Sequence, residues 1–367
     1  MSNRLAPLFG VLMLCLSACA PVMQQAMTVG RVTPATGFSD NWFTSYDGAR
    51  LGLSVWKPTA EPSKSEPSFG PNADADCPAL TNDAVVLCDL VSVPAKPQVV
   101  IIAVHGMNDY AGAFKAAGKY WSDHGAVVYA YDQRSFGRSP GWMIWPDPEV
   151  MRKDLATAVQ IARRMHPNAK IAVVGESMGA SVAITAFAER PPPGADALIL
   201  SGPGLYGWGV LPWTYSVSLW ASAHVRPGWI VVPPKEVHIT ATDNNEKLRE
   251  MWFDPNVQKT NRIDSVYGVV SIMEDADAKI SQLPPSVPTL LLYGAHDQVI
   301  PPEGVERAAR KLPPHVRTAY YAKGYHMLMN DLQAETVWKD VLAFVEDPKA
   351  PLPSKAPPLP WKRAAAS

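Results

Sequence analysis

The chain is predicted to be an α/β protein with a mostly parallel central sheet covered by helices on both faces. Short apolar runs alternate with segments of helical periodicity along most of its length. The runs are apolar throughout, as expected for parallel strands buried on both faces. The alternation breaks once, between Pro203 and Leu283, which indicates a cap inserted into this fold.

The order of the elements follows from these patterns. Strands are expected at 42–46, 51–56, 98–104, 126–131, 169–174, 197–201, 289–293 and 316–321. Asp47-Gly48 separates the first two and is a hairpin signal. Helices are expected at 111–124, 148–165, 178–190, 303–312 and 331–346. The predicted parts are a signal peptide 1–18, a tether 19–41, a core 42–202 and 284–346 with a surface insertion 58–97, a cap 203–283 after the sixth strand, and a Pro-rich tail 347–367.

Composition excludes several classes of protein. Lys and Arg number 33 against 34 Asp and Glu, a net charge of −1, so no basic field would attract a nucleic acid. Hydrophobic residues make up 47%, enough for a sizeable core, and the 36 Pro and 24 Gly are too few for a low-complexity chain. The sequence contains no CxxC motif and no Cys/His cluster, so we expect neither a metal site nor a cofactor.

The N-terminus has the pattern of an export signal. Arg4 precedes the apolar run Leu5–Leu16, which is too short to span a bilayer as a helix. The run ends in Leu16-Ser17-Ala18-Cys19, which looks like a bacterial lipobox. We therefore expect an acylated Cys19 as the mature N-terminus, holding the protein on a membrane that faces the periplasm. Ala20 is not an Asp-type retention signal, which favours the outer membrane; an ordinary cleaved signal peptide is the alternative.

Two further cysteines, Cys77 and Cys88, lie in the Pro- and Asp-rich insertion. An oxidising periplasm would permit a disulfide between them, and the alternative is a pair of free thiols.

One motif carries the chemistry. Gly175-Glu176-Ser177-Met178-Gly179 follows a predicted strand and opens a predicted helix, as a nucleophile elbow requires. Ser177 would stand above the sheet at a helix N-terminus, where the helix dipole favours developing negative charge. We expect Ser177 to be the nucleophile.

A serine nucleophile needs a base, an orienting acid and donors for the oxyanion. Asp297 follows the strand 289–293 and His326 follows the strand 316–321, in the order Ser, Asp, His that this fold uses. We expect Asp297 to orient His326, the general base. The backbone N–H groups of Met107 and Met178 are the expected oxyanion donors, and nearby His105 is expected to brace its loop.

These motifs together resemble the monoacylglycerol lipase/lysophospholipase group of α/β-hydrolases. The matching pieces, in the family's order, are Asp47-Gly48, Trp56-Lys57-Pro58, His105-Gly106, Asp132-Gln133-Arg134-Ser135-Phe136-Gly137-Arg138-Ser139, Gly175 to Gly179, Gly294 with Asp297 and Pro301, and Gly324-Tyr325-His326. The resemblance implies the α/β-hydrolase fold, the triad of Ser177, Asp297 and His326, the Met107/Met178 oxyanion hole, and a structural role for Asp132. The sequence departs from the family in Asp109-Tyr110, in the insertion and in the Trp-rich cap.

The function that we expect is hydrolysis of carboxylic esters of lipid-like substrates, of monoacylglycerol or lysophospholipid type, through an acyl-enzyme. Five tryptophans of the cap are expected to line the pocket and to favour longer acyl chains: Trp208, Trp213, Trp220, Trp229 and Trp252. An aminopeptidase of the proline-releasing type and a thioesterase are the alternatives on the same fold. An aminopeptidase would use acidic cap residues, for which Glu236, Asp243, Glu246 and Glu250 are available. A non-catalytic lipid-binding lipoprotein would have a broken triad.

Overall fold

The computed structural model describes residues 21–28, 35–58, 98–232 and 239–361. The proposed signal peptide, Cys19, Cys77 and Cys88 lie outside these residues, so the lipobox and the disulfide stay predictions. In the described part of the chain, no helix has the length and apolar character needed to cross a membrane.

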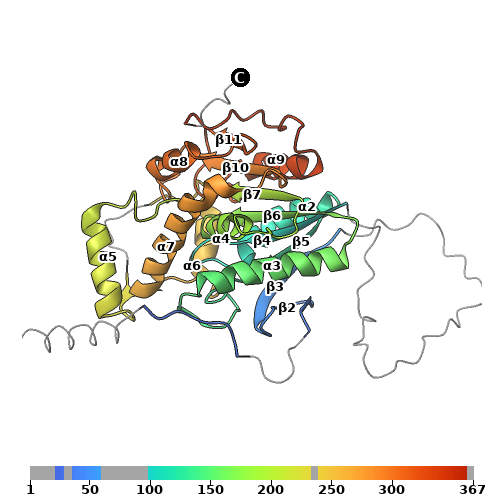
Figure 1. Ribbon diagram of the computed structural model, residues 1–367. Coiled ribbons are helices and arrows are strands. Elements are labelled where there is room, and N and C mark those ends of the chain that lie inside the picture. Colours follow the sequence, from blue (N-terminus) through green and yellow to red (C-terminus); the bar gives the residue numbers. More distant parts are fainter. Residues whose placement is uncertain (1–20, 29–34, 59–97, 233–238, 362–367) are drawn as a thin grey trace, which may run out of the picture.

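The described strands form a nine-stranded sheet, and its order is β1-β2-β3-β5-β4-β6-β7-β10-β11 (Figure 1). The first three strands and β5 pair antiparallel, and the sheet is parallel from β5 to β11. The strands are β1 (Gly37–Phe38), β2 (Trp42–Thr44), β3 (Arg50–Trp56), β4 (Val99–Val104), β5 (Val127–Tyr131), β6 (Lys170–Glu176), β7 (Ala197–Ser201), β10 (Thr289–Gly294) and β11 (Arg317–Tyr321). The predicted mostly parallel sheet is confirmed. The strand before the cap, predicted as the sixth, is β7 in this numbering because the short strand β1 precedes the predicted ones.

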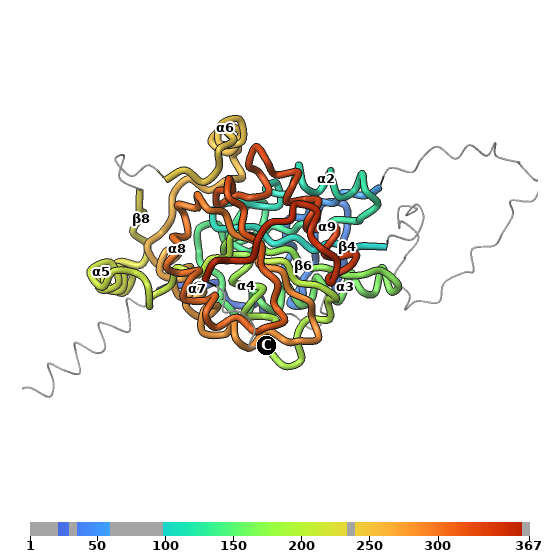
Figure 2. The backbone as a smooth tube through the Cα atoms, turned by 90° about the horizontal axis from the view of Figure 1, so that it is seen from above, coloured from blue at the N-terminus to red at the C-terminus, as the bar shows by residue number. Residues whose placement is uncertain are grey.

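Helices cover both faces of this sheet. On one face lie α3 (Pro148–Met165), α4 (Met178–Phe187) and α8 (Pro302–Ala309); on the other lie α2 (Lys115–Asp123) and α9 (Ala334–Glu346). The region after β7 contains α5 (Trp213–Val225), β8 (Ile230–Val231), α6 (Asn245–Phe253), β9 (Asn261–Arg262) and α7 (Ile263–Lys279). In this region α7 packs on α4, and α5 packs on α7 (Figures 1 and 2).

Local sequence explains where helices begin. The Asp147 side chain accepts the Glu149 N–H at 2.8 Å and Pro148 occupies the first turn, so α3 begins where predicted. The helix predicted from residue 331 begins only at Ala334. The reason is tertiary: Asp331 accepts the Tyr325 N–H at 2.8 Å and thereby belongs to the loop after β11.

Two segments expected to be extended away from the body are fixed to it. Near the N-terminus, Gln24 bonds with Trp145 and Asp147 through its backbone, and Phe38 stacks on Tyr129 at 4.6 Å between ring centroids. In the Pro-rich tail, the Leu359 N–H donates to Thr318 Oγ1 at 3.0 Å and the Pro357 carbonyl accepts the Tyr320 N–H. The tail thus covers β11, the edge strand of the sheet, which would otherwise expose unpaired backbone groups.

The cap tryptophans do not form the expected pocket lining. Trp208 packs against Tyr267 of α7, and these two line a cavity of about 430 Å³ with Trp220 that includes no triad residue. The other four are 49–77% exposed: Trp213, Trp220, Trp229 and Trp252. For Trp213 and Trp220 the reason is that α5 contacts the body through Leu219 and Ala223, which turns these aromatic side chains away from it.

A buried ion cluster joins the β2–β3 hairpin and α3 through the loop that follows β5. The fully buried Arg134 donates to Asp47 from Nη1 at 2.8 Å and to Asp154 from Nε at 2.7 Å. Next to it, Asp132 accepts the Ala111 N–H and the Arg138 guanidinium. Asp132 is therefore a structural hub, as the resemblance implied.

We predict that Arg134→Leu destabilises the protein by about 3–5 kcal/mol, because it leaves two carboxylates buried without a cation. Chemical unfolding measures this loss. Arg163→Leu is the control, since Arg163 pairs with Asp196 at the surface and its loss should cost about 1 kcal/mol or less. Equal losses in the two variants would contradict the prediction.

Candidate active site

Ser177 lies in the tight turn between β6 and α4. Its backbone has φ 53° and ψ −118°, a conformation that non-glycine residues rarely adopt. The turn exists only because its neighbours have no side chains. A Cβ on Gly179 would collide with the carbonyl oxygen of Val104, and a Cβ on Gly106 would lie 3.1 Å from the Ser177 Cβ. The elbow therefore lies directly against the end of β4.

His326 and Asp297 come together from the loops that follow β11 and β10. His326 Nδ1 lies 2.8 Å from Asp297 Oδ2, and both residues are buried. The other carboxylate oxygen of Asp297 accepts the backbone N–H groups of Val299 and Ile300, which fix its orientation. Because a carboxylate only accepts, the proton of a neutral His326 is on Nδ1, and Nε2 is free to act as a base.

The chain after β7 places His326 beside Ser177. The Ser177 N–H donates to the Ser201 carbonyl at 2.9 Å, and the Gly204 N–H donates to the Ser177 carbonyl at 3.0 Å. Between them, a Cβ on Gly202 would lie 2.8 Å from the His326 carbonyl oxygen and 3.3 Å from Nδ1. Ser177 and His326 thus contact the same four-residue segment, residues 201–204 at the carboxyl end of β7.

The two expected oxyanion donors flank this serine. Met178 is the first residue of α4, so its N–H has no acceptor within the helix. Met107 follows Gly106, whose position against Ser177 is described above. The loop is braced by His105, which donates from Nδ1 to the Gly106 carbonyl at 2.7 Å and accepts the Gln133 N–H at 2.8 Å. Burial lowers the pKa of His105, which keeps it neutral and suits this pair of bonds.

Three buried carboxyls around the triad escaped the sequence-based reasoning: Asp109, Glu176 and Asp331. Burial, reinforced by the charge of Asp109, raises the pKa of Glu176 to about 7, and burial raises the pKa of Asp331 to about 6. One oxygen of each of these two side chains has no hydrogen-bond partner among the described residues. For Glu176 the sequence did contain a signal, because this acidic residue ends an otherwise apolar strand immediately before the nucleophile.

These carboxyls act on His326. Burial by itself would lower the pKa of His326, but the charge of Asp297 and its hydrogen bond, followed by the charges of Glu176 and Asp331, raise it above its ordinary value. The site therefore favours the protonated imidazolium, the species that forms when a base accepts a proton from serine.

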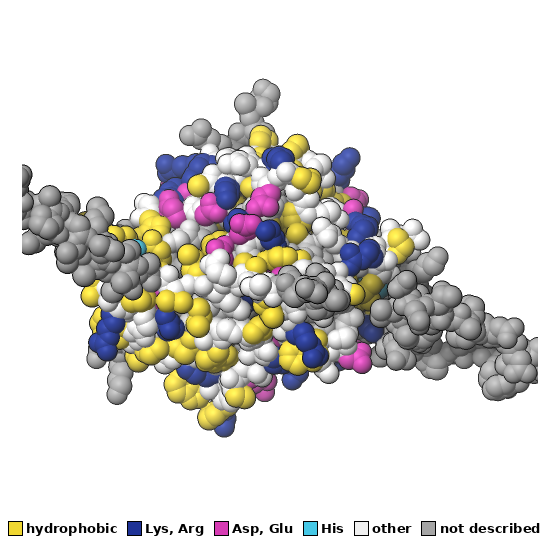
Figure 3. Space-filling model, turned by 60° about the horizontal axis from the view of Figure 1, so that its bottom comes forward, with side chains coloured by type: hydrophobic (Ala, Val, Ile, Leu, Met, Phe, Trp, Pro, Cys, Tyr) yellow, Lys and Arg dark blue, Asp and Glu magenta, His cyan; other side chains and the backbone are white. Residues whose placement is uncertain are grey.

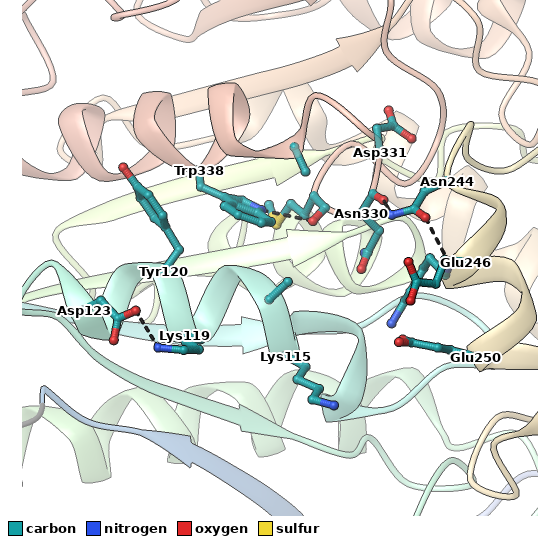
Figure 4. Close-up of a pocket in the computed structure, with 14 residues that line it drawn as sticks. Lys115, Lys119, Tyr120, Asp123, Asn244, Glu246, Glu250, Asn330, Asp331 and Trp338 are labelled. Carbon is teal, nitrogen blue, oxygen red and sulfur yellow. Dashed lines mark hydrogen bonds and ion pairs between the residues drawn. The ribbon is translucent and has the colours of Figure 1, made fainter.

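A cleft of about 560 Å³ lies between α2, α6, α9 and the loop that follows His326, and Ser177, Asp297 and His326 are not among the residues that line it (Figure 4). Lys115 of α2 lies opposite Glu250 of α6, and Asn330 and Asp331 enter from the loop (Figure 4). A second cavity of about 490 Å³ shares Lys115, Lys247 and Glu250 with the first and reaches Asp109. Together they form one polar groove that leads to the oxyanion loop.

The cap also holds the loop that carries His326. The Met327 N–H donates to the Ala241 carbonyl at 2.9 Å, and the Leu332 N–H donates to Asp243 at 2.8 Å. Asp243 is thus used for structure. Of the other acidic cap residues considered for an aminopeptidase, Glu246 and Glu250 line the cleft, and Glu236 lies outside the described residues.

We predict that Gly202→Ala lowers kcat at least tenfold while the protein stays folded. Gly202 has φ 47°, and its new Cβ would press on the ring and carbonyl of His326. Ester hydrolysis and circular dichroism measure the two effects. Gly194→Ala is the control, because a Cβ there meets no atom within 4 Å. Unchanged kcat in Gly202→Ala would refute the proposed packing of His326.

We predict that Glu176→Gln changes how stability depends on pH. The raised pKa of Glu176 means that the folded protein keeps a proton that the unfolded chain releases, so stability falls as pH rises from about 4.5 to about 7. Glutamine removes this loss, so the variant should gain about 3 kcal/mol relative to the parent between pH 4 and pH 8. Denaturant unfolding at both pH values tests it, and parallel stability curves would contradict it.

Comparisons with known proteins agree with this geometry. A monoacylglycerol lipase from Mycolicibacterium smegmatis is 25% identical over 268 residues, which cover 71% of this chain and 92% of that protein. Among solved structures, a monoacylglycerol lipase from Paleococcus ferrophilus superposes with a TM-score of 0.60 at 19% identity, covering 80% of this chain and 98% of that one. A thermostable carboxyl esterase from Bacillus coagulans reaches 0.63 at 20% identity, covering 85% and 99%.

The structural likenesses establish the α/β-hydrolase fold. The family model described as serine aminopeptidase S33 matches residues 95–333, a stretch that contains Ser177, Asp297 and His326. Because this match covers well over half of the chain and includes the whole catalytic edge of the sheet, the protein belongs to the serine aminopeptidase S33 family of α/β-hydrolases.

Proposed function

We propose that this protein is a serine hydrolase that cleaves carboxylic esters of single-chain lipids through an acyl-enzyme. The observation that carries the proposal is the meeting of Ser177, on its strained turn, with the hydrogen-bonded pair of His326 and Asp297 at one edge of the sheet. The similarity to monoacylglycerol lipases supports the ester substrate.

In the first half of the reaction, His326 Nε2 takes the proton of the Ser177 hydroxyl as its oxygen attacks the ester carbonyl carbon. The carbonyl oxygen becomes an oxyanion that accepts the N–H groups of Met107 and Met178. The bond to the alcohol then breaks, and the imidazolium gives its proton to the departing alkoxide. The products are a free alcohol and an acylated Ser177.

In the second half, water replaces the alcohol. His326 accepts one proton from water as the hydroxide oxygen attacks the acyl carbon, and the same N–H groups bind the new oxyanion. Collapse releases the fatty acid and returns the proton to Ser177. Asp297 stays ionised throughout and holds His326 in the required tautomer.

The surroundings of Ser177 suit a substrate with one polar and one apolar end. The groove that reaches Asp109 is lined by charged and amide side chains, which can bind a glycerol or glycerophosphate leaving group through hydrogen bonds and ion pairs. Met107 supplies apolar surface, and Met273 of α7 lies beside Gly204, which bonds to the Ser177 carbonyl. Monoacylglycerols and lysophospholipids both fit this description.

A proline-releasing aminopeptidase is the second candidate. Glu246 and Glu250 in the groove could hold a free amine, and the family model carries that activity in its name. Lys115 and Lys247 line the same groove as these acids, so the groove is of mixed charge rather than acidic, and we therefore rank ester hydrolysis first. A thioesterase would use the same acyl chemistry.

The place of action is part of the proposal. We infer from the lipobox that Cys19 is acylated and that the enzyme faces the periplasm, with the outer membrane favoured because Ala20 follows the cysteine. Cys77 and Cys88 would form a disulfide in that compartment.

We predict that Ser177→Ala abolishes ester hydrolysis, by a factor of about 10⁴ to 10⁶, while the fold survives. A fluorophosphonate probe should label the parent protein and not the variant. Ser122→Ala is the control, since Ser122 lies on α2 and its hydroxyl donates to the Lys119 carbonyl within that helix. Labelling of Ser177→Ala equal to that of the parent would refute the assignment.

We predict that kcat/KM rises with acyl length from acetyl to at least octanoyl, because each methylene removed from water contributes about 0.8 kcal/mol, close to a fourfold gain. A panel of p-nitrophenyl esters, monoacylglycerols, lysophospholipids and aminoacyl amides on the purified protein measures it. A maximum at acetyl, or a preference for aminoacyl amides, would overturn the lipid-ester proposal and leave the triad intact.

A further inference from the structure

We propose that an exposed face of the cap rests on the membrane that holds the chain's own lipid anchor. This α5 face consists of Trp213, Val217 and Trp220, and the exposed Trp229 follows just beyond the C-terminal end of the helix. The inference rests on the proposed acylation of Cys19 and goes beyond it, because an anchor alone would leave the orientation of the enzyme open.

The α5 face is unusually apolar for a surface. Trp213 is 77% exposed, Val217 58% and Trp220 49%, and α5 contains no Lys, Arg, Asp or Glu over its thirteen residues. Trp213, Val217 and Trp220 recur at the spacing of one helix face. Figure 3 shows hydrophobic side chains spread over the left and lower parts of the surface seen from below. A continuous patch of this kind indicates a binding surface rather than scattered exposed residues.

The N-terminal segment leads to this face. The Val22 N–H donates to Asp264 at 3.3 Å, and the backbone N–H of Asp264 donates in turn to the Pro227 carbonyl. The next residue back, Ile263, bonds to the Trp229 carbonyl at 2.7 Å. Val22 therefore lies at the C-terminal end of α5, where Figure 1 shows the start of the described chain beside the lower ends of α5 and α7.

The same segment is fixed along its length. Gln24 donates to the Trp145 carbonyl at 2.7 Å and accepts the Asp147 N–H at 3.0 Å, and the Met27 N–H donates to Asp47 at 2.7 Å. Residues 22–27 are thus bound to the body of the enzyme at several points, and they do not form a long free linker between it and the membrane.

The short stretch of chain between Cys19 and Val22 limits how far from α5 the acyl chains can enter the membrane. Cys19 precedes Val22 by three residues, which span at most about 10 Å. Acyl chains on Cys19 would therefore enter the bilayer within about 10 Å of the end of α5. Trp and Tyr prefer the membrane interface, and the exposed Arg226 at the end of α5 can meet anionic headgroups. The anchor and the α5 face thus contact one and the same lipid surface.

Photo-crosslinking in isolated membranes tests this orientation. The full chain, expressed with its export signal, carries a benzophenone amino acid in place of Val217 or, as a control, in place of Thr336 on α9, which covers the other face of the sheet. We expect phospholipid adducts at least tenfold more abundant at position 217. Equal yields at the two positions, in protein that carries palmitate on Cys19, would overturn the proposal.

A second experiment measures the consequence for catalysis. Trp213→Glu with Val217→Glu should lower hydrolysis of monoacylglycerol embedded in phosphatidylglycerol vesicles at least tenfold and leave hydrolysis of a soluble butyrate ester unchanged. Thr336→Glu with Lys339→Glu, on exposed positions of α9, should change neither. Unchanged vesicle activity in the α5 variant refutes the docked face. Loss of palmitate incorporation in the parent would refute the anchor instead, and the soluble-ester assay reports the chemistry separately.

Discussion

The strained turn at Ser177 is the constraint on which the site depends. A residue with a side chain held at φ 53° costs of order 1–3 kcal/mol, so it persists only where its surroundings leave no alternative. Those surroundings are β4 on one side and the segment after β7 on the other, both closer than any side chain would allow. Glycines at 106, 175, 179 and 202 are therefore needed for backbone contact, and the serine hydroxyl is presented to the same small space as His326.

Electrostatics of the site follow from its burial. Asp297 is satisfied by two backbone N–H groups and by His326, so its charge is available to the imidazolium without a competing cation. Oε1 of Glu176 has no such partner among the described residues, and burial raises the pKa of Glu176 to about 7.

Two segments outside the predicted core, residues 22–27 and 347–361, pack against the body of the enzyme. The tail at 347–361 closes the β11 edge, and the segment at 22–27 runs beneath the loop of Trp145 to the base of α7. The second of these connects the place where an anchor is proposed with the place where aromatic side chains are exposed. Four of the five cap tryptophans expected to line the pocket are exposed instead: Trp213, Trp220, Trp229 and Trp252.

Local patterns along the chain were sufficient to predict the strand and helix order, the hairpin at Asp47-Gly48 and the elbow, because periodicity and glycine spacing depend on a few neighbouring residues. The triad could be predicted because its members follow strands whose carboxyl ends must meet at one edge. The direction in which Trp213 and Trp220 point was not predictable, since it depends on which face of α5 meets α7. The same holds for Glu176 and Asp331, whose pKa values depend on burial and on charges brought close only by folding, such as Asp109 for Glu176 and Asp243 for Asp331. The docking of residues 22–27 was equally hidden, because their hydrogen bonds are made with Asp264, Trp145 and Asp47, partners that only the folded chain brings near.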